Sequence, residues 1–368
     1  MPRSQRPFRT WARHRVEVAS GAKARPKTGS AIIAAGKCMQ PPDRISVAVI
    51  GVGEHGRSHA RTLKEIPSAQ LAGVYDLRAD RAESVASELE CRHFANLDEA
   101  LESVDAVSVV IPATDHAPVA RRAFDLGVDV LMEKPISRTL EEADALVQRA
   151  EKEGRILQVG HLERFNPGVI AARKVTHHPM FFEIHRLGVF SPRSLDVDVV
   201  FDLMIHDLDL VLWMVEEPVR EVRAVGLAVL SDKVDIANAR VEFENGAVAN
   251  LTASRVSTEK IRKFRYFQPS EYISVDFARR DALVISVDRG SSSPQIGFRK
   301  LDTTPADPLK AELEAFLESV RTRRQPLVGG REGLAALALA VKVMNCIEQH
   351  ASRVQRHLGP VLGHPGES

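Results

Sequence analysis

The sequence predicts two domains: an α/β domain built on a doubly wound parallel sheet, then an α+β domain with an open-faced, mainly antiparallel sheet. Between residues 44 and 164, short β-branched runs alternate with helical segments, as in parallel sheets with helices on both faces. In residues 165–350, apolar and polar residues alternate with a period of two, which is typical of antiparallel strands with one packed face. We expect residues 1–43 to be a basic leader and residues 351–368 a flexible tail.

Composition and charge exclude several classes of protein. Hydrophobic residues make up 44% of the 368 residues, which is ordinary for a globular protein, and no apolar run approaches the roughly 18 residues of a membrane span. Three widely separated cysteines fit a reducing compartment, so we expect a cytoplasmic protein without disulfides or bound metal. Beyond residue 43, 41 basic and 47 acidic residues give a net charge of −6, which argues against a nucleic-acid partner.

Residues 1–43 differ in composition from the rest of the chain. They contain nine Lys and Arg residues but two acids, and they show no sustained hydrophobic period, so we expect disorder. Three interpretations are open. The segment is a transit peptide, a basic tail that contacts anionic partners, or a stretch upstream of the true start, since Met39 lies just before the first strand.

The first predicted strand, residues 45–50, runs directly into the glycine-rich turn GVGEHG. A helix follows over residues 57–66. A second strand, residues 70–76, ends on Asp76, which lies 20 residues after Gly56. A glycine turn with a strand before it, a helix after it and an acid at this distance predicts a dinucleotide-binding site.

Each residue of the turn has an expected role toward the dinucleotide. Gly51 permits the tight turn, Gly53 lets the backbone approach the pyrophosphate, and Gly56 lets the helix pack closely on the strand. Glu54 and His55 lie in the same turn, at the helix N-terminus where free N–H groups favour a diphosphate.

Asp76 determines the expected cofactor. Its carboxylate would accept hydrogen bonds from the adenosine ribose and repel a 2′-phosphate, so we expect NAD rather than NADP. Arg78 lies close enough in sequence to soften that preference.

Strands and helices continue to alternate up to residue 164. We expect further strands at 91–94, 106–111, 128–132 and 155–160, with helices at 78–89, 116–126 and 139–153. Ligands of doubly wound sheets bind beyond the carboxyl ends of the strands. Thr114, His116 and Glu133 lie at such ends, so we expect them at the cofactor, and Lys134 follows at the same edge.

The second domain is predicted from its alternating segments. We expect strands at 181–190, 219–230, 237–256 and 272–288, with hairpin turns at Asn245-Gly246 and Arg280-Asp281. Helices at 309–321 and 332–350 are expected to return to the first domain, and HHP (177–179) and the basic run KIRKFR (260–265) to be surface or loop features. Because an open sheet face needs cover, we expect a homo-dimer or homo-tetramer.

A nearly apolar helix is predicted over residues 201–215, FDLMIHDLDLVLWMV. Asp202, His206 and Asp209 are spaced at i, i+4 and i+7, which places them on one stripe of the helix. Carboxylates and imidazoles in such a helix need partners, so we expect the stripe to line a pocket. The alternative is that Asp202 caps the helix and His206 is a satisfied core histidine.

Four motifs occur in a fixed order: GVGEHG after the first strand, EKP at 133–135, GHLERFNP at 160–167 and DLMIHDLD at 202–209. With them, residues 44 to about 350 resemble the glucose–fructose oxidoreductase, inositol dehydrogenase and MocA-type family. The resemblance implies an NAD(P)-dependent enzyme that oxidises a secondary alcohol on a sugar, a cyclitol or a nucleotide sugar.

The resemblance also implies catalytic roles for Lys134, Asp202 and His206. A neutral His206 would accept the hydroxyl proton near neutral pH, Asp202 would hold its ring in one tautomer, and Lys134 would favour the developing alkoxide. Lys134 and His206 would thus contact the substrate. Arg164 and Asn166 are expected to face the cleft, with Arg164 placed to bind a diphosphate-bearing substrate.

The motifs further resemble the bacterial UDP-N-acetylglucosamine 3-dehydrogenase group. Its members oxidise the C3 hydroxyl to a 3-keto nucleotide sugar, which an aminotransferase can convert to a 3-amino sugar for lipid A. An inositol or free-sugar dehydrogenase is the alternative within the family. An NAD-dependent glycosidase with no net redox change, or a non-catalytic NAD-binding regulator, is the alternative outside that reaction class.

Overall fold

The computed structural model describes residues 44–191, 195–288 and 294–358. All of them belong to one compact unit of the chain. The predictions made for residues 1–43, and for the tail from residue 359 onward, lie outside the described residues.

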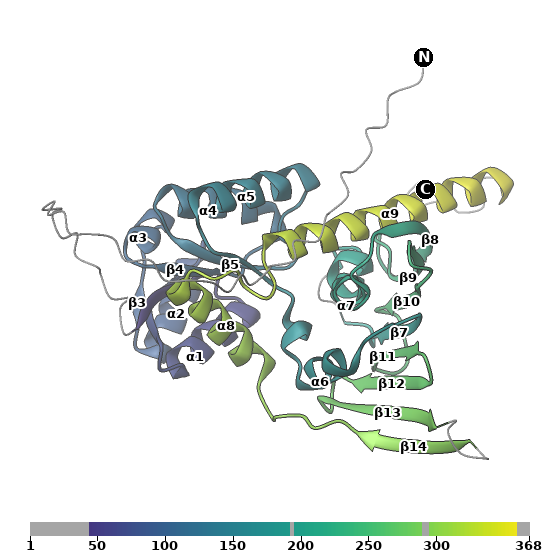
Figure 1. Ribbon diagram of the computed structural model, residues 1–368. Coiled ribbons are helices and arrows are strands. Elements are labelled where there is room, and N and C mark those ends of the chain that lie inside the picture. The colour runs from purple at the N-terminus through teal and green to yellow at the C-terminus, as the bar shows by residue number, and fades with distance from the viewer. Residues whose placement is uncertain (1–43, 192–194, 289–293, 359–368) are drawn as a thin grey trace, which may run out of the picture. The chain divides into compact units, whose positions relative to one another are not determined.

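The first sheet has six parallel strands in the order β3-β2-β1-β4-β5-β6. This order confirms the predicted doubly wound sheet. The strands are β1 (Ile45–Ile50), β2 (Ala69–Tyr75), β3 (Arg92–His93), β4 (Ala106–Val109), β5 (Asp129–Glu133) and β6 (Leu157–Gly160). β1, β4, β5 and β6 are almost wholly buried because helices cover both faces of the sheet (Figure 1).

Helices on the two faces form separate apolar cores. One face carries α1 (Glu54–Glu65), α2 (Ala79–Leu89) and α8 (Pro308–Thr322), and the other carries α3 (Leu97–Glu102), α4 (His116–Asp125) and α5 (Leu140–Glu153). Asn96 and Thr139 cap α3 and α5, because each side chain accepts a hydrogen bond from the backbone N–H three residues later. α5 ends at Gly154 in the left-handed region.

The second sheet has eight strands in the order β14-β13-β12-β11-β7-β10-β9-β8. β7 and β10 are parallel and every other neighbouring pair is antiparallel, which confirms the mainly antiparallel prediction. The strands are β7 (Phe181–Leu187), β8 (Val219–Leu227), β9 (Ile236–Phe243), β10 (Val248–Ser254), β11 (Ile261–Gln268), β12 (Glu271–Asp276), β13 (Asp281–Asp288) and β14 (Gln295–Lys300). α6 (Pro167–Val175) and α7 (Ile205–Val215) contribute to the core on one face of this sheet.

Two strands of this sheet differ from the prediction. The run KIRKFR is not a loop, because most of it forms the start of β11, where Phe264 and Tyr266 are fully buried. Lys263 and Arg265 alternate with them on the other face, and the four cations in six residues obscured that period of two. β14 was not predicted, because all six of its residues are exposed and only two of them, Ile296 and Phe298, are hydrophobic.

The turn predicted at Asn245-Gly246 is confirmed, with φ of +83° at Gly246 between β9 and β10. The second turn lies at residues 277–280, one residue earlier than predicted: Arg280 has φ of +56°, and Asp281 already pairs with Asp276 in β13. HHP at 177–179 is a loop.

The two C-terminal helices both return to the first domain, as expected. α8 places Leu313 and Phe316 in the core with α1 and β1. α9 (Gly330–Leu358) packs against α5 and β6, and also against α7 and β8 of the second domain. It continues through residues 351–358, where we expected a flexible tail, because neither Gly nor Pro interrupts it before Gly359.

No helix among the described residues is both long and apolar enough to cross a membrane. The domain boundary placed between residues 164 and 165 stays a prediction.

Candidate functional site

The glycine-rich turn joins β1 to α1 with the backbone that its role requires. Gly51 has φ of +86°, and a Cβ there would lie 2.3 Å from the carbonyl oxygen of Val110. A Cβ at Gly56 would lie 1.8 Å from the Gly51 oxygen, so the helix packs on the strand only with glycine. At Gly53 the nearest atom to a Cβ would be Arg81 Nη1 at 3.9 Å. The backbone is therefore open at the position where a pyrophosphate needs to approach.

Asp76 lies just beyond the end of β2 beside this turn. Its Oδ2 accepts a hydrogen bond from the Val52 N–H at 2.8 Å, and its Oδ1 accepts one from the Arg78 N–H at 3.0 Å. The Arg78 guanidinium turns away to Asp80, 2.7 Å distant. Arg81, which was not predicted, places Nη1 3.6 Å from Asp76 Oδ2. The cation nearest to a ribose-binding carboxylate is thus Arg81 rather than Arg78.

The predicted cofactor residues Glu54, His55 and Thr114 are all exposed. Glu54 and His55 occupy the first turn of α1, where backbone N–H groups lack helical partners. Thr114 lies in the short helix η1 (Ala113–Asp115) that follows β4. All three therefore lie beyond the carboxyl ends of their strands, as predicted.

His116 does not face a ligand, and the predicted cofactor contact of its side chain is wrong. It is 1% exposed, and its two ring nitrogens lie 2.9 Å from the backbone oxygens of Pro135 and Ile111. Burial lowers the pKa of His116 from its ordinary value, although these two carbonyls act in the opposite direction. The ring therefore supports the turn that carries Glu133 and Lys134.

Glu133, at the end of β5, is held by a residue that the sequence did not suggest. His59 on α1 is buried, with Nε2 3.3 Å from Glu133 Oε1 and Nδ1 2.9 Å from Ser108 Oγ. Burial by itself would raise the pKa of Glu133, but the hydrogen bond and charge of His59, with Lys134 and His55, hold it below its ordinary value. A charged Glu133 therefore stands next to Lys134.

Lys134 and Asp202 are brought together across 68 residues of sequence. Lys134 Nζ donates to the backbone oxygen of Asp202 at 2.7 Å and lies 3.5 Å from its Oδ1. Asp202 belongs to η3 (Val200–Met204), a π-helical turn that leads into α7. In a π-helix the hydrogen bonds run from i to i+5, so residues at i and i+4 no longer stack as in an α-helix. For that reason Asp202 contacts Lys134 and makes no hydrogen bond to His206 in the part of the chain described, contrary to the expected role of holding its ring.

His206 lies beside a second histidine. The ring of His161 is 6.3 Å from that of His206 between centroids, edge to face, and His161 is 1% exposed. Burial lowers the pKa of His161, and burial together with Lys134 lowers that of His206 well below its ordinary value. Both rings are therefore neutral near pH 7. His161 follows Gly160 in the motif GHLERFNP, and its position directly after a strand end was the signal in the sequence.

The prediction that Arg164 and Asn166 face the cleft is wrong. Arg164 is 3% exposed and binds Asp209 in a fork, with Nε–Oδ2 and Nη2–Oδ1 distances of 2.8 and 2.6 Å. Asn166 is buried, caps α6 through the Gly168 N–H at 3.0 Å, and donates to the Phe277 oxygen at 3.3 Å. Asp209, the third residue of the predicted stripe, binds Arg164 through both of its carboxylate oxygens and, among the described residues, does not line a pocket with His206.

A second buried fork lies next to His206. Arg186 on β7 binds the carboxylate of Asp207 at 2.8 and 2.7 Å and Glu163 Oε1 at 3.0 Å. Burial opposes the charge of Arg186, but the two carboxylates raise its pKa above the ordinary value. Asp207 therefore anchors α7 to the second sheet immediately after the candidate base.

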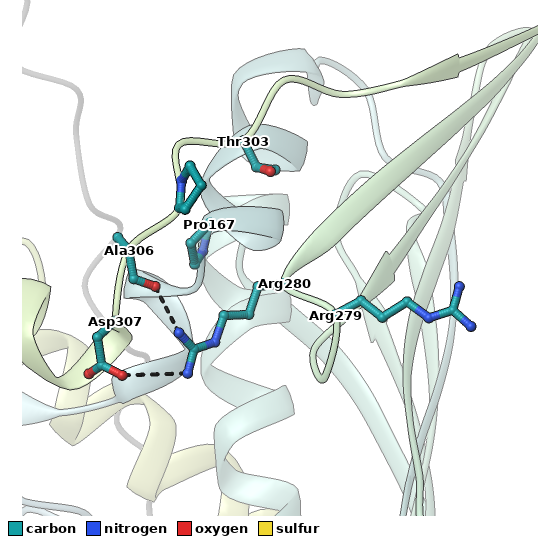
Figure 2. Close-up of a pocket in the computed structure, with 7 residues that line it drawn as sticks. Pro167, Arg279, Arg280, Thr303, Ala306 and Asp307 are labelled. Carbon is teal, nitrogen blue, oxygen red and sulfur yellow. Dashed lines mark hydrogen bonds and ion pairs between the residues drawn. The ribbon is translucent and has the colours of Figure 1, made fainter.

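A separate hollow of about 390 Å³ lies at the turn between β12 and β13 (Figure 2). In it Arg280 donates to the oxygen of Ala306 at 2.9 Å and reaches Asp307, whereas Arg279 extends away. Lys134, Asp202 and His206 do not line it. We assign this hollow a structural role, because its guanidinium fastens the segment that leads into α8.

The geometry joins a dinucleotide-type turn to a proton-transfer site. The turn and Asp76 fit a dinucleotide, because Gly51 and Gly56 have no room for a side chain and the space beside Gly53 is open to a pyrophosphate. Lys134 offers a cation, and His206 offers a neutral imidazole. Such an arrangement suits removal of a proton from a hydroxyl group.

Comparisons with known proteins agree with this geometry. Residues 45–161 match the sequence model of an oxidoreductase family with an NAD-binding Rossmann fold, and residues 179–268 match the C-terminal domain of the GFO/IDH/MocA proteins. Both matches lie within the predicted domains.

Individual relatives extend over most of the chain. A UDP-N-acetylglucosamine 3-dehydrogenase of Acidithiobacillus ferrooxidans is 43% identical over 309 residues, which is 83% of this chain and 98% of that protein. A solved structure of that enzyme superposes with a TM-score of 0.78 over the same shares of the two chains. A myo-inositol 2-dehydrogenase of Thermotoga maritima is 26% identical over 83% of this chain and 97% of its own length.

Proposed function

This chain belongs to the GFO/IDH/MocA family of NAD(P)-binding oxidoreductases, and from that premise we propose that it oxidises the C3 hydroxyl of UDP-N-acetylglucosamine with NAD. The observation that carries the proposal is the contact of Lys134, at the carboxyl edge of the first sheet, with Asp202, which lies one helical turn before the neutral His206. The substrate is proposed from the similarity to the Acidithiobacillus enzyme.

The residues of the site divide the work of the reaction. Bound NAD supplies the acceptor for the hydride. His206 takes the hydroxyl proton on Nε2, because Nδ1 is buried without a partner among the described residues. Lys134 favours the developing negative charge on the substrate oxygen. Asp202 holds Lys134 in place through its backbone oxygen and carboxylate.

Several further assignments belong to this proposal. NAD is preferred over NADP because Asp76 repels a 2′-phosphate. The enzyme acts in the cytoplasm, assembles as a homo-dimer or homo-tetramer through the open face of the second sheet, and provides a 3-keto nucleotide sugar to an aminotransferase for lipid A.

The experiment that tests the function is NADH formation by the purified protein with NAD and UDP-N-acetylglucosamine. A 3-aminotransferase added as a trap draws off the keto product. We expect NADH formation to fall at least 100-fold in His206→Ala, which removes the base, and in Lys134→Ala. Dissociation constants for NAD should change less than threefold in both variants.

Other results would decide between the alternatives. No NADH from the nucleotide sugar, but NADH from myo-inositol, would favour the inositol dehydrogenase. Glycan cleavage without net NADH would favour the glycosidase, and NAD binding without turnover of any of these substrates would favour the regulator. Wild-type turnover in His206→Ala would remove that residue from catalysis.

A further inference from the structure

Arg262 is the one cation of the basic run KIRKFR that β11 places on the packed face of the second sheet. It pairs in register with Arg186 of β7, and directly opposed residues of antiparallel strands lie on the same face. Phe264 and Tyr266 continue this row and are fully buried. Lys263 and Arg265 lie on the opposite face.

The register places Arg262 beside the candidate base. Its neighbour Arg186 binds Asp207 at 2.7 Å, and Asp207 directly follows His206. The charge of Arg262 also acts on His206 and Asp207. Arg262 therefore lies at the same end of α7 as the proton-transfer site.

Arg262 differs from Arg186 in its partners. Arg186 is buried and bound by two carboxylates, whereas Arg262 is exposed and makes no hydrogen bond or ion pair to any residue that the structure describes. Although the side chain is exposed, nearby protein displaces part of its surrounding water, and this desolvation together with the charge of Arg186 lowers the pKa of Arg262 from its ordinary value. A guanidinium in this position is stabilised by an added anion, and its five N–H donors suit a phosphate.

We infer that Arg262 forms an anion subsite that binds the diphosphate of a nucleotide sugar while the sugar ring reaches His206. The inference rests on the proposed function for the identity of the anion. It also replaces Arg164, whose guanidinium is fully engaged by Asp209. Inositols and free sugars carry no phosphate, so Arg262 acts as a specificity residue that favours nucleotide sugars over them.

The test measures binding of UDP to protein saturated with NADH, which keeps the nucleotide out of the cofactor site. Three variants are compared with wild type: Arg262→Met, which removes the charge, Arg262→Lys, which keeps the charge without the fork, and Lys263→Met, a control on the opposite face. We expect the Kd for UDP to rise about 10–100-fold in Arg262→Met, since charge-assisted phosphate contacts are strong. Arg262→Lys should be intermediate and Lys263→Met within twofold of wild type.

Kinetics separate this inference from the function itself. With UDP-N-acetylglucosamine as substrate, Arg262→Met should raise KM by the same factor and leave kcat within threefold. Turnover of UDP-N-acetylglucosamine by wild type with an unchanged KM in Arg262→Met would overturn the subsite and leave the function intact. Arg262-dependent UDP binding without turnover would support the subsite and overturn the substrate. Absence of UDP binding to wild type would overturn the subsite.

Discussion

At the scale of single residues, the proposed preference for NAD over NADP is attributed to Asp76. Both carboxylate oxygens are fixed by backbone N–H groups of Val52 and Arg78, so the charge is held beside the glycine turn. Arg81 lies 3.6 Å from the same carboxylate and partly compensates it. A 2′-phosphate would therefore be repelled by Asp76 and attracted by Arg81. Of the two, Asp76 is hydrogen-bonded directly to the backbone of the glycine-rich turn.

We predict that Asp76→Asn lowers the preference for NAD over NADP by roughly tenfold. The amide oxygen can still accept the Val52 N–H, so the turn survives, but the repulsive charge is gone. The measurement is kcat/KM with each cofactor, and Asp80→Asn, in an exposed pair with Arg78, is the matched control. An unchanged ratio in Asp76→Asn would remove this carboxylate from the ribose site.

Sequence alone named candidate catalytic residues but not all of their partners. Lys134, Asp202 and His206 could be named because their motifs are local. The contact of Lys134 with Asp202, in place of an Asp202–His206 pair, could not be predicted, since it depends on the π-helical turn η3. Arg164 was misassigned because an arginine in a polar motif resembles a ligand group until its partner, 45 residues away, is known.

At the scale of secondary structure elements, buried ion pairs join α7 to the short helix that follows β6 and to β7. Arg164 in η2 (Leu162–Phe165) forms an ion pair with Asp209, and its guanidinium carbon lies over Trp213, 5.1 Å from the ring centroid. Arg186 forms an ion pair with Asp207, the residue that follows the candidate base His206. Two forks on one helix fix both its position and its rotation, which an apolar face alone would not do.

We predict that Arg164→Met destabilises the protein by about 3–5 kcal/mol, because it leaves the Asp209 carboxylate buried without a partner. Urea denaturation measures the loss. Arg149→Met, which breaks a more exposed pair with Glu153, should cost about 0.2–1 kcal/mol and is the control. A large rise in KM for Arg164→Met with unchanged stability would restore the substrate-binding role that the structure contradicts.

Strand prediction failed for β11 and β14 for physical reasons at this scale. The buried residues of β11 are Phe264, Tyr266 and Gln268, and the four cations of the run lie around or before them. β14 is an edge strand defined only by its backbone pairing to β13, and its side chains bury nothing. Its two alternating hydrophobic residues, Ile296 and Phe298, are too few to define a strand from the sequence.

At the scale of the whole molecule, groups with opposite pH behaviour are buried on one chain. The pKa values of His116, His161 and His206 are lowered mainly by burial. The contribution of these histidines to the free energy of unfolding is complete above the pKa of an unfolded histidine, about 6.5. It is lost as the pH falls below that value, because the unfolded state then binds more protons than the native state. Glu312 has the opposite sign: burial, then Glu133, raises its pKa well above the ordinary value.

We predict that Glu312→Gln stabilises the protein at pH 8. The native carboxyl is 1% exposed, and both oxygens lack partners among the described residues. Wild type therefore loses stability as the pH rises above about 4.5, where the unfolded carboxyl ionises first. Thermal melts of the two proteins should diverge between pH 5 and pH 8, by about 2–4 °C for each kcal/mol gained.

The matched control is Glu314→Gln on the exposed face of the same helix, which should melt with wild type at both pH values. Parallel melts of wild type and Glu312→Gln would show that the buried carboxyl is ionised in the native protein.

The packing of α8 has a consequence for biosynthesis. Leu313, Phe316 and Leu317 complete the cover of one face of the nucleotide-binding sheet beside α1 and α2, and they are synthesised about 270 residues after β1 begins at Ile45. On the ribosome this face therefore stays partly uncovered while the entire second sheet is translated. The first domain can therefore fold completely only after nearly the whole polypeptide has emerged. A stalled or truncated chain would expose apolar surface on its cofactor-binding domain, and it would depend on chaperones to avoid aggregation.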